Sequence, residues 1–214
     1  MKFMKTAKIL LGMAAVAAMG LVSCDEAGKL AGQVEGTWKG ATTEMLGDKH
    51  HKGHNMPTQP VMSMMCTPVF TFSRTDGTKG GTLDIQADYV LTQGLLATSD
   101  IQGPFSATVK GTATARGTWT AKDDDEIMVV MDPSMIKVEV DTASLALNYT
   151  ALTDRPASDL AAIKARVAGN VESQVRTVIT NRVMKLRELD DIKVQDRSMT
   201  LEIGHAKMVF TKES

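Results

Sequence analysis

"FSATVKGTATARGTWTAK", residues 105–122, alternates small or apolar side chains with polar ones along its whole length. Such a period of two predicts a β-strand with one buried face. At about 3.3 Å per residue the stretch would span roughly 60 Å, so we expect it to bend or turn at Gly111 or Gly117. The inward parity is Phe105, Ala107, Val109, Gly111, Ala113, Ala115, Gly117, Trp119 and Ala121.

The same alternation recurs on both sides of this stretch. Turn signals such as Asp76-Gly77, the acidic run that starts at Asp123, and Asp132-Pro133 separate the alternating segments. The pattern predicts a mainly β protein, a meander of antiparallel strands that forms a barrel or sandwich. The further strands are expected in residues 83–91, 136–140, 145–149, 199–203 and 206–210.

One segment, residues 158–189, changes to helical spacing. Its apolar residues recur every three or four positions, which predicts one long amphipathic helix, kinked or split at Gly169-Asn170. We expect its apolar face to pack on the barrel or to plug its open end. This face comprises Leu160, Ile163, Val167, Val171, Val175, Val178, Ile179, Val183 and Leu186.

Residues 1–23 are typical of a signal peptide. Three lysines precede an uncharged apolar run that is too short to span a bilayer comfortably. The run ends in Leu21-Val22-Ser23-Cys24, which resembles the lipobox of bacterial lipoproteins. The resemblance implies cleavage before Cys24, acylation of its thiol (palmitate or a similar chain) and attachment of the domain to a membrane of the cell envelope. The alternative is an ordinary signal peptide that happens to precede a cysteine.

The expected location is the cell envelope, with the outer membrane favoured over the inner one. Asp25 and Glu26 follow the cysteine and leave the leaflet and the periplasmic or surface face open.

Removing three signal-peptide lysines leaves 21 basic and 25 acidic residues, a net charge of −4. A balance this acidic argues against nucleic acid as a partner. We expect a lipidated tether at residues 24–33 and one domain at 34–214.

"VEGTWKG", residues 34–40, resembles the Gly-x-Trp motif that opens lipocalins and other calycins. "FTFSRTDGT", residues 70–78, resembles the first hairpin of lipocalin-like domains in bacterial lipoproteins. The resemblance implies an antiparallel up-and-down barrel with Gly36 and Trp38 as structural residues at its floor. The sequence departs from the family in three ways: it has no Thr-Asp-Tyr motif, the last strand offers no arginine for the tryptophan, and the helix precedes the last hairpin.

An eight-stranded barrel holds either a side-chain core or one small ligand. The small residues of the long strand leave volume, which the helix, large facing side chains or a small hydrophobic ligand would fill. No hydrolase elbow, phosphate loop or His-Glu-x-x-His motif occurs, so we expect a binding protein and no enzyme or cofactor. The candidates for the ligand cavity are Ala107, Val109, Ala113, Ala115, Trp119 and Met128.

A second hypothesis concerns "DKHHKGHNMPTQPVMSMMC", residues 48–66. Three histidines there suit zinc or Cu(II), while thioether and thiol groups suit Cu(I). Its spacing matches no established template, so a surface loop is the competing interpretation. The metal candidates are His50, His51, His54, Met64 and Cys66. A third hypothesis is an interaction or scaffold protein whose barrel is filled; the oligomeric state stays open.

Overall fold

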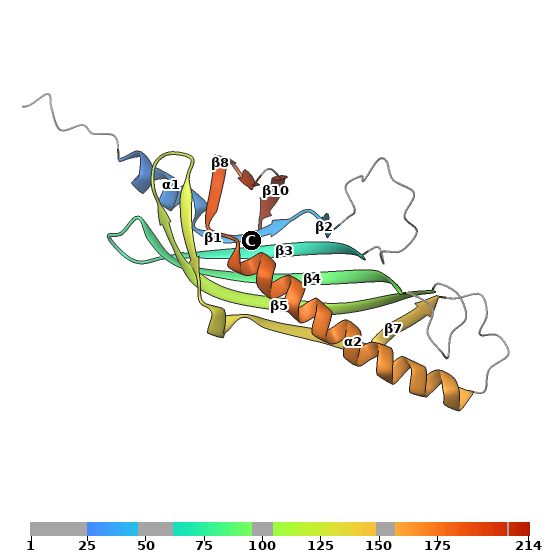
Figure 1. Ribbon diagram of the computed structural model, residues 1–214. Helices are drawn as coiled ribbons and strands as arrows, with labels where there is room; N and C mark the ends of the chain where they lie inside the picture. Colours follow the sequence, from blue (N-terminus) through green and yellow to red (C-terminus); the bar gives the residue numbers. More distant parts are fainter. Residues whose placement is uncertain (1–24, 47–61, 96–104, 149–156, 205) are drawn as a thin grey trace, which may run out of the picture.

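The computed structural model describes residues 25–46, 62–95, 105–148, 157–204 and 206–214. Their strands form one antiparallel sheet that curls on itself (Figure 1). The elements are α1 (Glu26–Val34), β1 (Gly36–Gly40), β2 (Thr43–Leu46), β3 (Met62–Arg74), β4 (Gly80–Leu95), β5 (Phe105–Ala121), β6 (Ile127–Met131), the 3-10 helix η1 (Pro133–Met135), β7 (Lys137–Asn148), α2 (Ala157–Met184), β8 (Glu188–Gln195), β9 (Ser198–Ile203) and β10 (Ala206–Lys212).

Eight of the described strands close into a barrel. Their order around it is β1-β3-β4-β5-β6-β8-β9-β10, and β1 closes the circle because it pairs with both β3 and β10. Neighbours in the barrel follow the order of the chain, so the barrel is of the up-and-down kind. The predicted fold class is confirmed: a mainly β, calycin-like antiparallel barrel with one long helix.

The barrel closes over only part of the long strands. β5 pairs with β7 over Ser106–Thr114 and with β6 over Gly117–Ala121. Likewise, β3 pairs with β2 at Met64–Cys66 and with β1 at Val69–Phe72. The strands β3, β4 and β5 therefore continue beyond the barrel as an extension flanked by β2 and β7.

The stretch at residues 105–122 forms a single continuous strand. It does not turn back at either glycine, but curves with its neighbours (Figure 1). The predicted parity is correct, because Ala107, Val109 and Trp119 are all buried. A Cβ atom at Gly111 would lie 2.2 Å from the Tyr89 hydroxyl, so the glycine leaves space for that ring.

Residues 24–33 were expected to form a tether, but most of this segment is helix α1. The Asp25 carboxylate caps the helix by accepting a hydrogen bond from the Gly28 N–H at 3.0 Å. One face of α1 is buried at the end of the barrel, against β3 and β5. Its buried residues are Ala27, Leu30, Ala31 and Val34, a helical spacing that was not predicted from the sequence.

Trp38 lies in the same core, fully buried. Its indole Nε1–H donates to the Val34 carbonyl at 2.6 Å, which joins β1 to the end of α1. Lys212 of the last strand places its Nζ 5.0 Å from the ring centroid, so a lysine supplies the cation where an arginine was sought. Gly36 has φ +119°, and a Cβ there would lie 2.8 Å from Cε of Lys212.

The helix α2 covers the extension of the sheet. It is one helix of 28 residues, not split at Gly169-Asn170, and it ends at Met184 rather than near residue 189, where β8 has already begun. Its apolar stripe is a packing face, as predicted. The buried residues of that stripe are Ile163, Val167, Val171, Val175 and Ile179.

The buried apolar residues fall into two clusters. The barrel core surrounds Trp38 and Trp119 and includes the buried face of α1. The helix core lies between α2 and the inner faces of β4, β5 and β7, and includes Leu91, Val109 and Val138. Within the described ranges, neither α1 nor α2 combines the length and the apolar character that crossing a bilayer requires.

We predict that Trp38→Ala lowers the free energy of unfolding by about 3–5 kcal/mol, because the barrel core cannot collapse around so large a gap. Trp38→Phe keeps an aromatic ring and loses the bond to Val34, so its loss should be clearly smaller. Chemical denaturation followed by circular dichroism measures both. The control Lys39→Ala alters an exposed neighbour and should stay within about 0.5 kcal/mol of the parent. Equal stabilities for all four proteins would contradict the assignment of Trp38 to the core.

Candidate ligand-binding cavity

A cavity of about 520 Å³ lies where the two cores meet. Its walls come from the middle of β3, β4 and β5, from the C-terminal part of α2, and from the β9–β10 hairpin. Some lining residues belong to the barrel core and others to the helix core. Phe70 and Met208 belong to the barrel core, Tyr89, Ala113 and Ile179 belong to the helix core, and Cys66 is a further lining residue.

Small side chains on the inner face of β4 and β5 keep this space open. Ala87 pairs directly with Ala113, and Ile85 pairs with Ala115 one step further along the two strands. All four line the cavity. Alanine has no side-chain atom beyond Cβ. Ala87, Ala113 and Ala115 therefore leave space between the sheet and α2. The volume that the sequence predicted near the small residues of the long strand is therefore present at two of them, Ala113 and Ala115.

The interior wall offers few polar groups. The Tyr89 hydroxyl donates to the Glu139 carbonyl at 2.8 Å, and burial raises the pKa of this phenol to about 12. Cys66 is 7% exposed, and burial, together with the charge of Asp88, raises the pKa of its thiol to about 11. Both groups are therefore neutral at physiological pH. The wall suits an apolar molecule, and it contains no thiolate nucleophile at neutral pH.

The other cavity candidates from the sequence lie elsewhere. Ala107 and Val109 are buried in the helix core, and Trp119 packs edge-on against Phe72 in the barrel core at 5.5 Å between ring centroids. Met128 was a wrong choice, because its side chain is 42% exposed. Its neighbours in β6 point inward, so the alternation of the strand turns Met128 to the outer face.

The structure places two of the metal candidates. Met64 and Cys66 stand two residues apart on the inner face of β3, and both line the cavity. His50, His51 and His54 lie outside the described residues. Two soft sulfur atoms thus face the same space as the apolar wall, without a described nitrogen ligand beside them.

The two charged residues of the cavity lining were not foreseen from the sequence. Arg182 and Lys185 line the cavity from the end of α2, and both are exposed, which puts them at its rim. The helical pattern did identify the neighbouring apolar stripe. The pattern could not show where along the sheet the helix would end. The two cations lie at the rim because α2 ends there.

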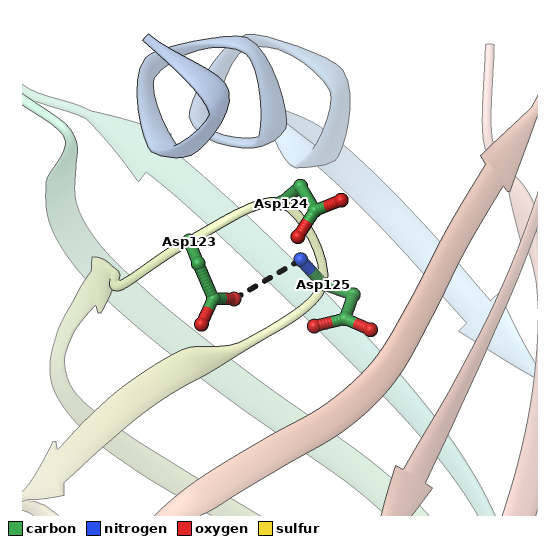
Figure 2. A group of neighbouring side chains, drawn as sticks. All are labelled: Asp123, Asp124 and Asp125. Carbon is green, nitrogen blue, oxygen red and sulfur yellow. Dashed lines mark hydrogen bonds between the residues drawn. The ribbon is translucent and has the colours of Figure 1, made fainter. Parts of the chain in front are cut away.

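The acidic turn between β5 and β6 holds one of two carboxylate clusters in the described part of the chain (Figure 2). Asp123 accepts hydrogen bonds from the backbone N–H groups of Asp125 and Glu126, at 3.2 and 2.9 Å. Desolvation and the adjacent carboxylates raise the pKa of Asp125. Asp123 thus shapes a hairpin turn, as the turn signal at this acidic run predicted.

A second acidic group lies next to this turn, where β6 meets β8. Glu126, Glu188 and Asp190 each bring a carboxylate oxygen within 4.8 Å of the others. Lys122 neutralises part of this charge through an ion pair with Glu126 at 2.6 Å. A hydrogen bond with Glu126, followed by the charge of Asp190, raises the pKa of Glu188. The ion pair with Lys122 therefore offsets part of the repulsion between these carboxylates, and the raised pKa of Glu188 reflects the repulsion that remains.

We predict that Cys66 reacts slowly with iodoacetamide in the folded protein. A thiol with a pKa of about 11 is roughly a thousandth thiolate at pH 8, whereas an ordinary cysteine is about one quarter thiolate. The alkylation rate, measured by mass spectrometry in the full chain carrying Cys24→Ala, should be at least about 100-fold below that of the same chain in guanidinium. The rate should rise with pH up to about 11. Equal rates in both states would contradict the buried position of the thiol.

No protein-family model, curated protein or solved structure was found to match this chain. The calycin-like description therefore depends on the strand order and on the closure of the barrel by β1. Any functional conclusion has to come from the cavity and from the sequence.

Proposed function

We propose that this protein is a non-enzymatic lipoprotein of the cell envelope that binds a small hydrophobic molecule between the barrel and α2. The cavity of about 520 Å³ is the observation that carries the proposal. Its volume lies within the range of about 300–1,000 Å³ that is usual for small-molecule sites. A barrel whose interior were completely filled by its own side chains would not need small residues at the meeting point of two cores.

The chemistry of the walls selects the class of ligand. Apolar side chains from β3, β4, β5 and α2 surround the cavity, and the two titratable groups inside it, Cys66 and Tyr89, are neutral. Moving apolar surface from water into such a site is favourable by roughly 25 cal/mol per Å². Met64 and Met208 add flexible side chains, which adapt to ligands of different outline.

The membrane anchor is the second part of the proposal, and it comes from the sequence. The uncharged apolar run that ends at Cys24 and the resemblance of residues 21–24 to a lipobox support acylation of this cysteine. A bilayer is then one partner of the protein, and the ligand of the cavity is another. The outer membrane remains the favoured location.

The metal hypothesis survives as an alternative for the same space. Met64 and Cys66 face the cavity, and sulfur ligands suit Cu(I). We favour the hydrophobic ligand because the described wall supplies many more apolar atoms than sulfur ligands. Uptake of one copper ion per chain that displaces an apolar probe, and is lost on Cys66→Ala, would reverse this preference.

We predict saturable binding of N-phenyl-1-naphthylamine, a neutral apolar fluorophore, to the full chain carrying Cys24→Ala. Ala113→Trp and Ala115→Trp each place an indole in the cavity, so the fluorescence titration should show at least about tenfold weaker binding, because the probe and the indole compete for the same volume. The melting temperature shows whether the variants remain folded.

The matched control is Thr118→Trp, which adds the same indole to the exposed outer face of β5. Its binding should equal that of the parent. A flat titration with the parent, together with destabilisation by Ala113→Trp through overpacking, would contradict the proposal and favour a scaffold protein with a filled barrel.

For the anchor, we predict that the protein incorporates a fatty-acid probe in cells and that Cys24→Ala abolishes the labelling. The reason is that the thiol of Cys24 and the new amino terminus are the attachment points that a lipobox provides. Cys66→Ala serves as the matched control, and it should be labelled like the parent because Cys66 is buried. Labelling that persists in Cys24→Ala would contradict the lipoprotein assignment.

A further inference from the structure

The charged residues of the cavity are of one sign. Its lining includes Arg182 and Lys185 and contains no aspartate or glutamate among the described residues. This local charge contrasts with the rest of the protein, because acidic residues outnumber basic ones once the signal peptide is removed. Two cations at the rim of an apolar cavity produce a positive potential at its entrance.

Neither cation is neutralised in the described part of the chain. The ion pairs found there involve Arg74, Lys79, Arg116, Lys122 and Arg176. By contrast, the two rim cations have no hydrogen-bonded or ion-paired side-chain partner within the ranges that the structure describes. Their charge is thus available to a group that enters from solvent.

A structural role at the end of the helix accounts for only part of this arrangement. Arg182 stands in the last turn of α2, where a cation stabilises the helix dipole. The partial negative charge of that helix end, about half an elementary charge, would by itself repel an anion. Two full positive charges outweigh it, so the rim as a whole attracts anions.

We propose that the ligand is an amphiphile with an aliphatic tail and an anionic head, carboxylate or phosphate. This inference rests on the proposed binding of a hydrophobic molecule in the cavity. The tail lies against Ala113, Ala115 and Cys66, and the head stays at the rim beside Arg182 and Lys185. The inner wall offers an anion little to bind, because the Tyr89 hydroxyl already donates its hydrogen bond to the Glu139 carbonyl. The orientation with the head outward follows from this difference between wall and rim.

The test compares four amphiphiles with the same tail. Dodecanoate and dodecyl phosphate are anionic, dodecan-1-ol is neutral, and dodecyltrimethylammonium is cationic. Each competes, below its micelle-forming concentration, against N-phenyl-1-naphthylamine bound to the full chain carrying Cys24→Ala. Because this probe is uncharged, its own binding does not depend on the rim cations. Protection of Cys66 from alkylation gives a second measure of occupancy at the wall.

We expect both anionic amphiphiles to displace the probe at lower concentration than the alcohol, and the cationic one to be the weakest. The ranking of dodecanoate against dodecyl phosphate distinguishes the two head groups. Arg182→Gln and Lys185→Gln should each weaken anion binding about two- to fivefold, and the double variant about tenfold, because exposed charge pairs have energies of this size. The preference for anions should shrink as salt is added.

Arg187→Gln is the matched control, an exposed cation in the same region that does not line the cavity. It should leave all four affinities unchanged, as should each rim variant for dodecan-1-ol. If the alcohol binds as tightly as the anions, or if the double variant keeps the anion preference, this inference is wrong while the hydrophobic site stands. If the neutral probe itself does not bind, the proposed function fails first, and the head-group assignment fails with it.

Discussion

Three strands that are longer than the barrel they belong to determine this architecture. β3, β4 and β5 contain 13, 16 and 17 residues and are paired along nearly their whole lengths. The closing strand β1 has only five residues and pairs with just one end of β3. Since one face of the long strands is mostly apolar, the part beyond the barrel needs a second cover. The helix α2 is that cover, so one sheet supports two separate cores.

The cavity is a consequence of this division. Each core is packed well around its own large side chains, such as Trp119 in the barrel and Leu91 below α2. Between them the sheet carries the alanine pair Ala87–Ala113 and, beside it, Ala115, and the cavity separates these residues from the end of α2. A molecule bound there would contact both cores at once. It would therefore stabilise the position of the helix relative to the barrel, because any ligand that binds only the assembled form favours that form.

Much of the fold could be predicted from alternation alone, because a period of two sustained over so many residues is typical of a strand and of little else. The expected strands at residues 136–140 and 145–149 proved to be one strand, β7, whose pairing with β5 shifts register between Thr108 and Lys110. β8 was missed because positions 188–195 carry too many charges to show an apolar face, and Asp191 adopts φ 49° beside a further register shift.

The binding site was harder to predict than the fold. Ala113 and Ala115 could be proposed from their size, but Met128 required knowledge of which face of β6 points inward. The rim cations depended on the tertiary position of the helix end.

The short helix α1 has a consequence for how the molecule would stand on a membrane. Its cap, Asp25, is bonded to Gly28 and forms an ion pair with Lys79 of the β3–β4 turn at 2.6 Å. If Cys24 carries acyl chains, the lipids are attached one residue before Asp25, which caps α1. The α1 end would then rest on the bilayer, and the long axis of the molecule would point away from it (Figure 1). The barrel core would then stand between the bilayer and the cavity, which lies where that core meets the helix core.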